Sequence, residues 1–138
     1  MFDHCIYFNT TALARMLERE WAKAFAPLGL TPPQAFMLRV ILEKPGLLQR
    51  EIADELTITR PTATRALDGL QEKGLIRRET TERDGREYAI KPTADAVAIK
   101  EQINAASGEV TRRLKKKLGT AEFDETVARL RGIRSAFK

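Results

Sequence analysis

Apolar residues recur every three or four positions along most of the chain, which is the pattern of helices that bury one face. Residues 5–28 form the first predicted helix, and Gly29 ends it because glycine readily adopts a left-handed conformation. Thr31, Pro32 and Gln34 then make a capping box with proline in the first turn, so a second helix is predicted from there to about residue 43.

Two shorter helices are predicted after the break at Pro45 and Gly46. The first covers residues 49–56, and the second is capped by Thr59 and covers residues 60–73. Their predicted buried positions are Ile52, Ala53 and Leu56 in the first helix and Ala63, Leu67 and Leu70 in the second. A turn of three residues, 57–59, joins the two helices.

The pattern changes from helical to alternating after Leu75, where two short extended segments are separated by the polar residues 82–86. Asp84-Gly85 is a turn signal, because glycine takes positive φ without steric cost. A β-hairpin is therefore predicted up to about Pro92.

One long helix is predicted from Thr93 to about Leu118, and Gly119 separates it from a last helix. Their apolar stripes are Ala96, Ile99, Ile103, Ala106 and Val110 in the long helix and Phe123, Val127, Leu130, Ile133 and Phe137 in the last one. The small chain offers these stripes no obvious internal surface, so pairing with a second copy is expected.

The predicted fold class is mainly α with a small β-hairpin wing. Three segments are expected: N-terminal helices for dimerisation and scaffold (1–45), a lobe made of the two short helices and the hairpin (46–92) and C-terminal dimerisation helices (93–138).

The net charge of +5 suggests a polyanionic partner, but its distribution weakens that argument. Residues 46–92 carry equal numbers of basic and acidic side chains, and the excess lies in residues 93–138. The basic run at residues 112–117 is interpreted as a solvated helix face. The chain has no apolar run of about 18 residues and no signal peptide pattern, which predicts a cytoplasmic protein without membrane association.

With one cysteine and one histidine, the chain offers neither an internal disulfide nor the ligands of a structural zinc site. It also lacks a phosphate-cradling glycine-rich loop and a nucleophile elbow. We therefore expect no cofactor, no metal and no catalytic activity.

The helices at residues 49–56 and 60–73 match a helix-turn-helix, in which the second helix enters the major groove of DNA. The buried stripe leaves the start of that helix available for contact, and the residues predicted there are Arg60, Thr62, Thr64 and Arg65. Arginine can bind guanine O6 and N7, threonine methyls can meet thymine methyls, and hydroxyls can meet phosphates. Arg83 and Arg86 would extend from the hairpin toward a minor groove.

Three segments in this order and spacing, residues 30–38, 50–78 and 84–93, resemble the multiple antibiotic resistance regulator (MarR) family, whose Asp-x-Arg wing motif appears as Asp84 and Arg86. The resemblance implies a homodimeric winged helix-turn-helix protein that binds a pseudo-palindromic double-stranded DNA operator. It further implies repression that a small aromatic or anionic effector, or an oxidant, relieves. Asp84 would brace the wing by pairing with an arginine; the alternative is a turn residue that bonds its own backbone.

The sequence departs from the family at two positions, with Leu48 where a Ser or Thr cap is usual and Ala63 where a larger aliphatic residue is usual. Trp21, Phe25 and Phe36 are candidates for lining an effector cleft, against the alternative that they are core residues.

Two alternatives to a ligand-released regulator stay open. Cys5 is a candidate oxidant sensor, since peroxide-sensing family members carry a reactive cysteine in the first helix near tyrosines, and Tyr7 is close. The other interpretation of Cys5 is a small buried residue at a dimer interface. The second alternative is a winged-helix protein-interaction module that does not bind DNA.

Overall fold

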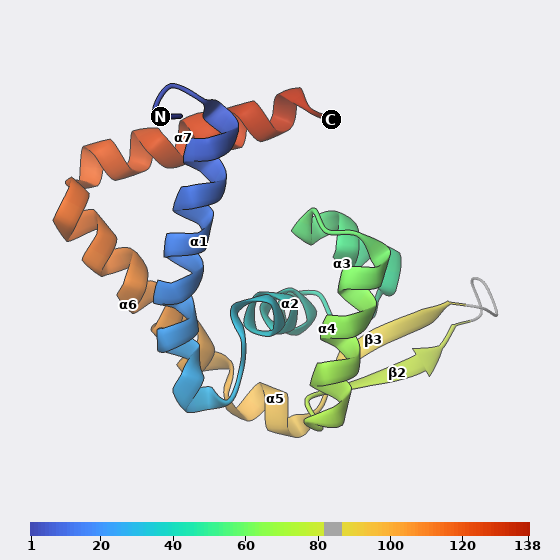
Figure 1. Cartoon of the computed structure of the whole chain (residues 1–138). Helices are drawn as coiled ribbons and strands as arrows, with labels where there is room; N and C mark the ends of the chain where they lie inside the picture. The colour runs from blue at the N-terminus through green and yellow to red at the C-terminus, as the bar shows by residue number, and fades with distance from the viewer. Residues whose placement is uncertain (82–86) are drawn as a thin grey trace.

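Helices make up most of the computed structural model, which describes residues 1–81 and 87–138, and a three-stranded antiparallel sheet completes it (Figure 1). In chain order the elements are α1 Ile6–Phe25, the 3-10 helix Ala26–Leu28, α2 Pro32–Glu43, β1 Leu47–Leu48, α3 Gln49–Leu56, α4 Arg60–Glu72, β2 Ile76–Thr80, β3 Tyr88–Pro92, α5 Ala94–Ala98, α6 Lys100–Leu118 and α7 Thr120–Ala136. The predicted fold class is confirmed. None of the helices in these described ranges has both the length and the apolar character to span a membrane.

Local capping rules explain where α2 and α3 begin. In α2, Thr31 Oγ1 accepts from the Gln34 amide at 3.3 Å, and Gln34 Oε1 accepts from the Thr31 amide at 3.2 Å, as the capping box predicts. Leu48 has no side-chain oxygen to cap α3, but Glu51 Oε1 accepts from the Leu48 amide at 2.9 Å. One half of a capping box therefore remains at the position where the sequence departs from the family.

The sheet joins the lobe formed by α2, α3 and α4. Its strand order is β1-β3-β2, with Leu47 opposite Ile90 and Ile76 opposite Pro92. The sequence predicted the hairpin but not β1, which is too short to show an alternating pattern. Leu48 of β1 and Ile90 of β3 are both buried. The hydrophobic core continues from the lobe to Phe25 of α1.

The prediction of one continuous helix from Thr93 to Leu118 is wrong, because the chain leaves the helical path at Ile99 (φ −105°, ψ 4°). Both parts pack against α2, but α5 also packs against β3, whereas α6 also packs against α1 and α7. Figure 1 shows α5 crossing below the lobe before α6 follows α1 toward the opposite end of the molecule. Ala96 and Ile103 are both fully buried, one on each side of the break.

The apolar stripes of the last two helices have different surroundings. Ile103 and Val110 of α6 are buried within this chain, so the expectation that this stripe lacks an internal surface is wrong. On α7, by contrast, Val127, Leu130 and Ile133 are each more than 40% exposed. An uncovered apolar face therefore runs along the last helix.

A polar junction connects α1, α2 and α6. Ser107 of α6, the only buried polar residue in the described ranges, accepts hydrogen bonds from Trp21 Nε1 at 3.0 Å and Arg39 Nη1 at 3.1 Å. Arg39 Nε also donates to Asn104 Oδ1 at 2.9 Å, and its guanidinium lies 5.0 Å from the centre of the Phe36 ring. Four polar side chains thus fasten the lobe to the two long helices.

Candidate nucleic-acid interface

The turn between α3 and α4 sets the crossing of the two helices. Thr57 has φ 56° and ψ 49°, and in the described part of the chain it is the only non-glycine residue with positive φ. The Ile58 amide donates to the Ala53 carbonyl at 3.0 Å, and the Ile58 side chain packs against the core. The left-handed residue reverses the chain within three residues, as a helix-turn-helix requires, although this conformation is unfavourable for a β-branched side chain.

The first two turns of α4 carry the residues predicted to contact DNA. Ala63, Leu67 and Leu70 are fully buried, which holds the opposite face of the helix toward solvent. Arg60 and Arg65 are exposed, whereas Thr62 and Thr64 are half-buried. Of these four residues on α4, the two arginines have the more exposed side chains.

Thr62 belongs to the cap of α4. The Thr59 hydroxyl accepts from the Thr62 amide at 3.4 Å and donates to Thr62 Oγ1 at 3.0 Å. Arg65 Nη2 lies 3.5 Å from the same Thr62 oxygen. These contacts order the start of the helix, whose dipole is positive there and favours an anion such as phosphate.

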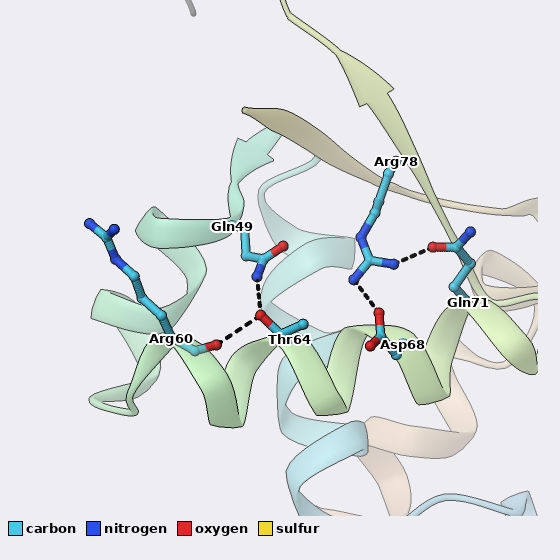
Figure 2. A network of polar contacts seen from close by, with 6 residues as sticks. All are labelled: Gln49, Arg60, Thr64, Asp68, Gln71 and Arg78. Carbon is cyan, nitrogen blue, oxygen red and sulfur yellow. Dashed lines mark hydrogen bonds and ion pairs between the residues drawn. The ribbon is translucent and has the colours of Figure 1, made fainter. Parts of the chain in front are cut away.

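Thr64 is engaged inside the lobe. Its hydroxyl donates to the Arg60 carbonyl at 3.0 Å and accepts from Gln49 Nε2 at 2.6 Å (Figure 2). Gln49 was not among the predicted site residues, because its contact depends on how α3 crosses α4 and leaves no mark in the local sequence.

A second interaction fixes the hairpin against α4. Arg78 of β2 binds Asp68 Oδ1 through Nη2 at 2.8 Å and donates to Gln71 Oε1 through Nη1 (Figure 2). The Arg78 side chain is only 18% exposed. The sequence analysis missed this clamp, which neutralises the carboxylate on the outer face of α4.

Most other charges of the lobe are also paired. Arg50 binds Glu87 at 2.8 Å, and Arg77 and Lys91 flank Glu79 at 2.9 and 3.0 Å. The hydrogen bond from Arg77, followed by that from Lys91, holds the pKa of Glu79 below its usual value of 4.5.

Arg60 and Arg65 differ from these residues, because no carboxylate in residues 1–81 or 87–138 forms an ion pair with either guanidinium. Two positive charges without a carboxylate partner thus lie close together at the start of α4, whereas Lys73 at the other end of the helix donates to the Gly29 carbonyl and to Gln34 Oε1. Such a pair of positive charges attracts the phosphates of DNA.

Three predicted site residues, Arg83, Asp84 and Arg86, fall in residues 82–86, outside the described part of the chain. Their roles as minor-groove probes and as the wing brace stay predictions.

A groove of about 770 Å³ opens between α1, α2 and α4. Trp21 and Phe36, two of the three predicted cleft residues, line it together with Thr62 and Arg65 from α4. Phe25 lies in the core instead, fully buried and edge-on to Phe36 at 6.1 Å between ring centres. The groove is mainly apolar, and Arg65 brings a cation and Glu18 an anion to its wall.

Cys5 precedes α1 and is exposed in the single chain. Its Sγ accepts from the Phe8 amide at 3.5 Å, so the thiol occupies the capping position of the helix. Tyr7 is 75% exposed.

Comparison with known proteins gives one consistent result. The profile of the MarR family matches residues 28–87. A protein from Thauera aromatica named for regulation of the hcr operon is 31% identical over 105 residues, which cover 76% of this chain and 63% of that protein. An HTH-type transcriptional repressor of Mycobacterium tuberculosis is 30% identical over 103 residues, covering 72% of this chain and 74% of the repressor.

Two further matches cover nearly the whole chain. The organic hydroperoxide resistance transcriptional regulator of Bacillus subtilis is 27% identical over 134 residues, covering 86% of this chain and 91% of that regulator. The solved structure of the transcriptional repressor CouR, bound to a 23-mer DNA duplex, superposes with a TM-score of 0.83 at 26% identity. That superposition covers 96% of this chain and 94% of CouR.

Proposed function

The chain belongs to the MarR family of DNA-binding transcription regulators, which are not enzymes, and on that premise we propose that it is a homodimeric repressor of a pseudo-palindromic operator. The observation that carries the proposal is the pair of unpaired guanidiniums, Arg60 and Arg65, at the start of α4, in a lobe whose other described charges are largely paired. In this proposal α4 enters the major groove, and the protein acts in the cytoplasm, where its operator lies.

Arg60 and Arg65 contact guanine edges or phosphates, and Thr62 contributes its methyl and hydroxyl groups. Arg83 and Arg86 follow the adjacent minor groove, with Asp84 as their brace. Residues 46–92 thus act as the DNA-binding lobe, and residues 1–45 and 93–138 fix the distance between two such lobes.

The test is a gel-shift titration against fragments of the chromosome that the purified protein selects. The double variant Arg60→Ala plus Arg65→Ala should bind these fragments at least about tenfold more weakly, with a shallower dependence on salt. Arg112→Ala plus Arg113→Ala is the matched control, because it removes the same charge from α6 and should leave affinity nearly unchanged. If both double variants lose affinity equally, α4 is not the helix that contacts DNA in the major groove.

The apolar face of α7 supports the homodimer. Val127, Leu130 and Ile133 are 42–43% exposed, and Ile6 and Leu13 of α1 are 67% and 44% exposed. A second copy would cover these side chains and gain about 25 cal/mol for each Å² of apolar surface removed from water. Sedimentation of Leu130→Glu should show monomers, whereas Arg131→Glu, on the same helix, should remain dimeric; a dimeric Leu130→Glu would contradict this interface.

The groove between α1, α2 and α4 supports release by a small aromatic or anionic effector. Trp21 and Phe36 offer apolar surface, and Arg65 offers a counter-ion to a carboxylate. Because Arg65 also faces DNA in this proposal, an effector and the operator would compete for one guanidinium. Benzoate should weaken operator binding by the wild type more than by Trp21→Ala, and equal weakening would exclude this groove as the effector site.

Release by an oxidant is the second candidate, and the exposure of Cys5 favours it. The similarity to a regulator named for organic hydroperoxide resistance points the same way. Organic hydroperoxide should then release the wild type from its operator and leave Cys5→Ser bound. Release of Cys5→Ser by the same treatment would exclude a role for this thiol.

A further inference from the structure

The edge of α4 that faces the hairpin is formed by Arg60, Thr64, Asp68 and Gln71, spaced four, four and three residues apart (Figure 2). Three of these side chains are used for bonds within the lobe: Thr64 by Gln49, and Asp68 and Gln71 by Arg78. Besides the Arg60 guanidinium, the group near this edge that remains available to a base is the side-chain amide of Gln49, the first residue of α3.

Two hydrogen bonds of the Thr64 hydroxyl orient the side-chain amide of Gln49. The Thr64 hydroxyl has one proton, which it donates to the Arg60 carbonyl at 3.0 Å. With that proton used, the oxygen accepts from the NH₂ end of Gln49, whose Nε2 lies 2.6 Å away. Figure 2 shows the Gln49 oxygen turned away from Thr64.

The amide held in this way keeps two groups for a ligand. No described residue donates to Oε1, and Nε2 has a second hydrogen besides the one directed at Thr64. An acceptor and a donor in one plane match the N6 amino group and N7 of adenine in the major groove. The Arg60 side chain, on the same edge of α4, provides the positive charge that brings this edge to DNA (Figure 2).

We propose that Gln49 reads an adenine in each half of the operator and that Thr64 is the positioning residue that orients its amide. The sequence analysis placed Thr64 among the residues that touch DNA, whereas this arrangement gives the hydroxyl an internal role. The inference rests on the proposed function, because it requires that α4 binds the major groove.

The test compares the binding sites that full-length variants select from a pool of random duplexes. The wild type should show a strongly preferred A·T pair at one position of each half-site, favoured by about 5- to 150-fold over other pairs. Gln49→Ala should lose the preference at that position and keep it elsewhere. Gln102→Ala, which removes an exposed glutamine from α6, is the matched control and should keep every preference.

Substitutions of Thr64 separate positioning from simple packing. Thr64→Val keeps the shape of the side chain but cannot hold the amide, so it should lose the same preference as Gln49→Ala. Thr64→Ser keeps the hydroxyl and should restore the preference. A merely structural role of Thr64 would instead lower affinity at all positions equally.

The outcomes are distinguishable. A uniform loss of affinity by Gln49→Ala, with every base preference kept, would assign the amide to phosphate and overturn the inference. Unaltered selection by Gln49→Ala would overturn it as well. A wild type that enriches no site refutes the proposed function itself.

Discussion

Ser107 offers the sharpest test of how the lobe is fastened to the long helices. It is 6% exposed, and its hydroxyl oxygen accepts from both Trp21 Nε1 and Arg39 Nη1. Ser107→Ala removes the acceptor for both donors. Arg39 keeps Asn104 and its stacking on Phe36, so the half-buried indole N–H of Trp21 bears most of the loss.

The loss of stability in Ser107→Ala can be estimated from the Trp21 N–H that loses its acceptor. A fully buried donor left without an acceptor costs about 1–3 kcal/mol, and because the Trp21 N–H is only half-buried, Ser107→Ala should lower the free energy of unfolding by an amount near the lower end of that range. For a chain of this size the midpoint of thermal unfolding should fall by about 4 °C.

The assay is thermal unfolding by circular dichroism at one fixed protein concentration, since the midpoint of a dimer depends on concentration. Ser135→Ala is the matched control, because Ser135 is exposed and its hydroxyl bonds only to the Arg131 carbonyl of its own helix. It should stay within about 0.5 kcal/mol of the wild type. If Ser107→Ala is no less stable than Ser135→Ala, the junction does not depend on this hydroxyl.

The left-handed conformation of Thr57 should make Thr57→Gly more stable than the wild type by about 0.5–1 kcal/mol in urea unfolding, because relief of the αL cost outweighs the added chain entropy; a lower midpoint would contradict the strain. Arg78→Ala leaves Asp68 unneutralised beside phosphates, so operator affinity in gel shifts should fall by at least about tenfold, whereas Arg112→Ala should keep it. The folded-state pKa of Glu79 lies below 4.5, so its stabilising contribution is present above that pH and disappears as the pH falls through the folded value. Glu79→Gln should therefore lower the urea midpoint at neutral pH but not at strongly acidic pH, and an equal effect at both would refute the pairing.

Features governed by neighbouring residues were predictable from the sequence. The capping box of Thr31 and Gln34 and the cap at Thr59 depend only on local spacing, and the structure contains both. The order of most elements and the exposed arginines of α4 followed from hydrophobic periodicity, because a buried stripe on one side of a helix leaves the opposite side to solvent.

Features governed by contacts between distant segments were not predictable. Local helix propensity gave no reason to break the chain at Ile99, since the break serves the separate packing of α5 and α6. Gln49 and Thr64 are 15 residues apart, and the partners Arg78 and Asp68 are joined across two elements. The hydrophobic pattern of a sequence indicates which residues face the core, but it does not indicate which polar side chains meet where two helices or a helix and a strand pack together.

Trp21, the only tryptophan in the chain, lines the groove beside α4 and donates to Ser107. Its indole is therefore a fluorophore placed where an effector would enter, next to the junction between the lobe and the long helices. Light that excites tryptophan selectively would report on this one location, without a label and without a background from other indoles. Unmodified protein can thus be screened optically for molecules that enter the groove, even before its operator is known.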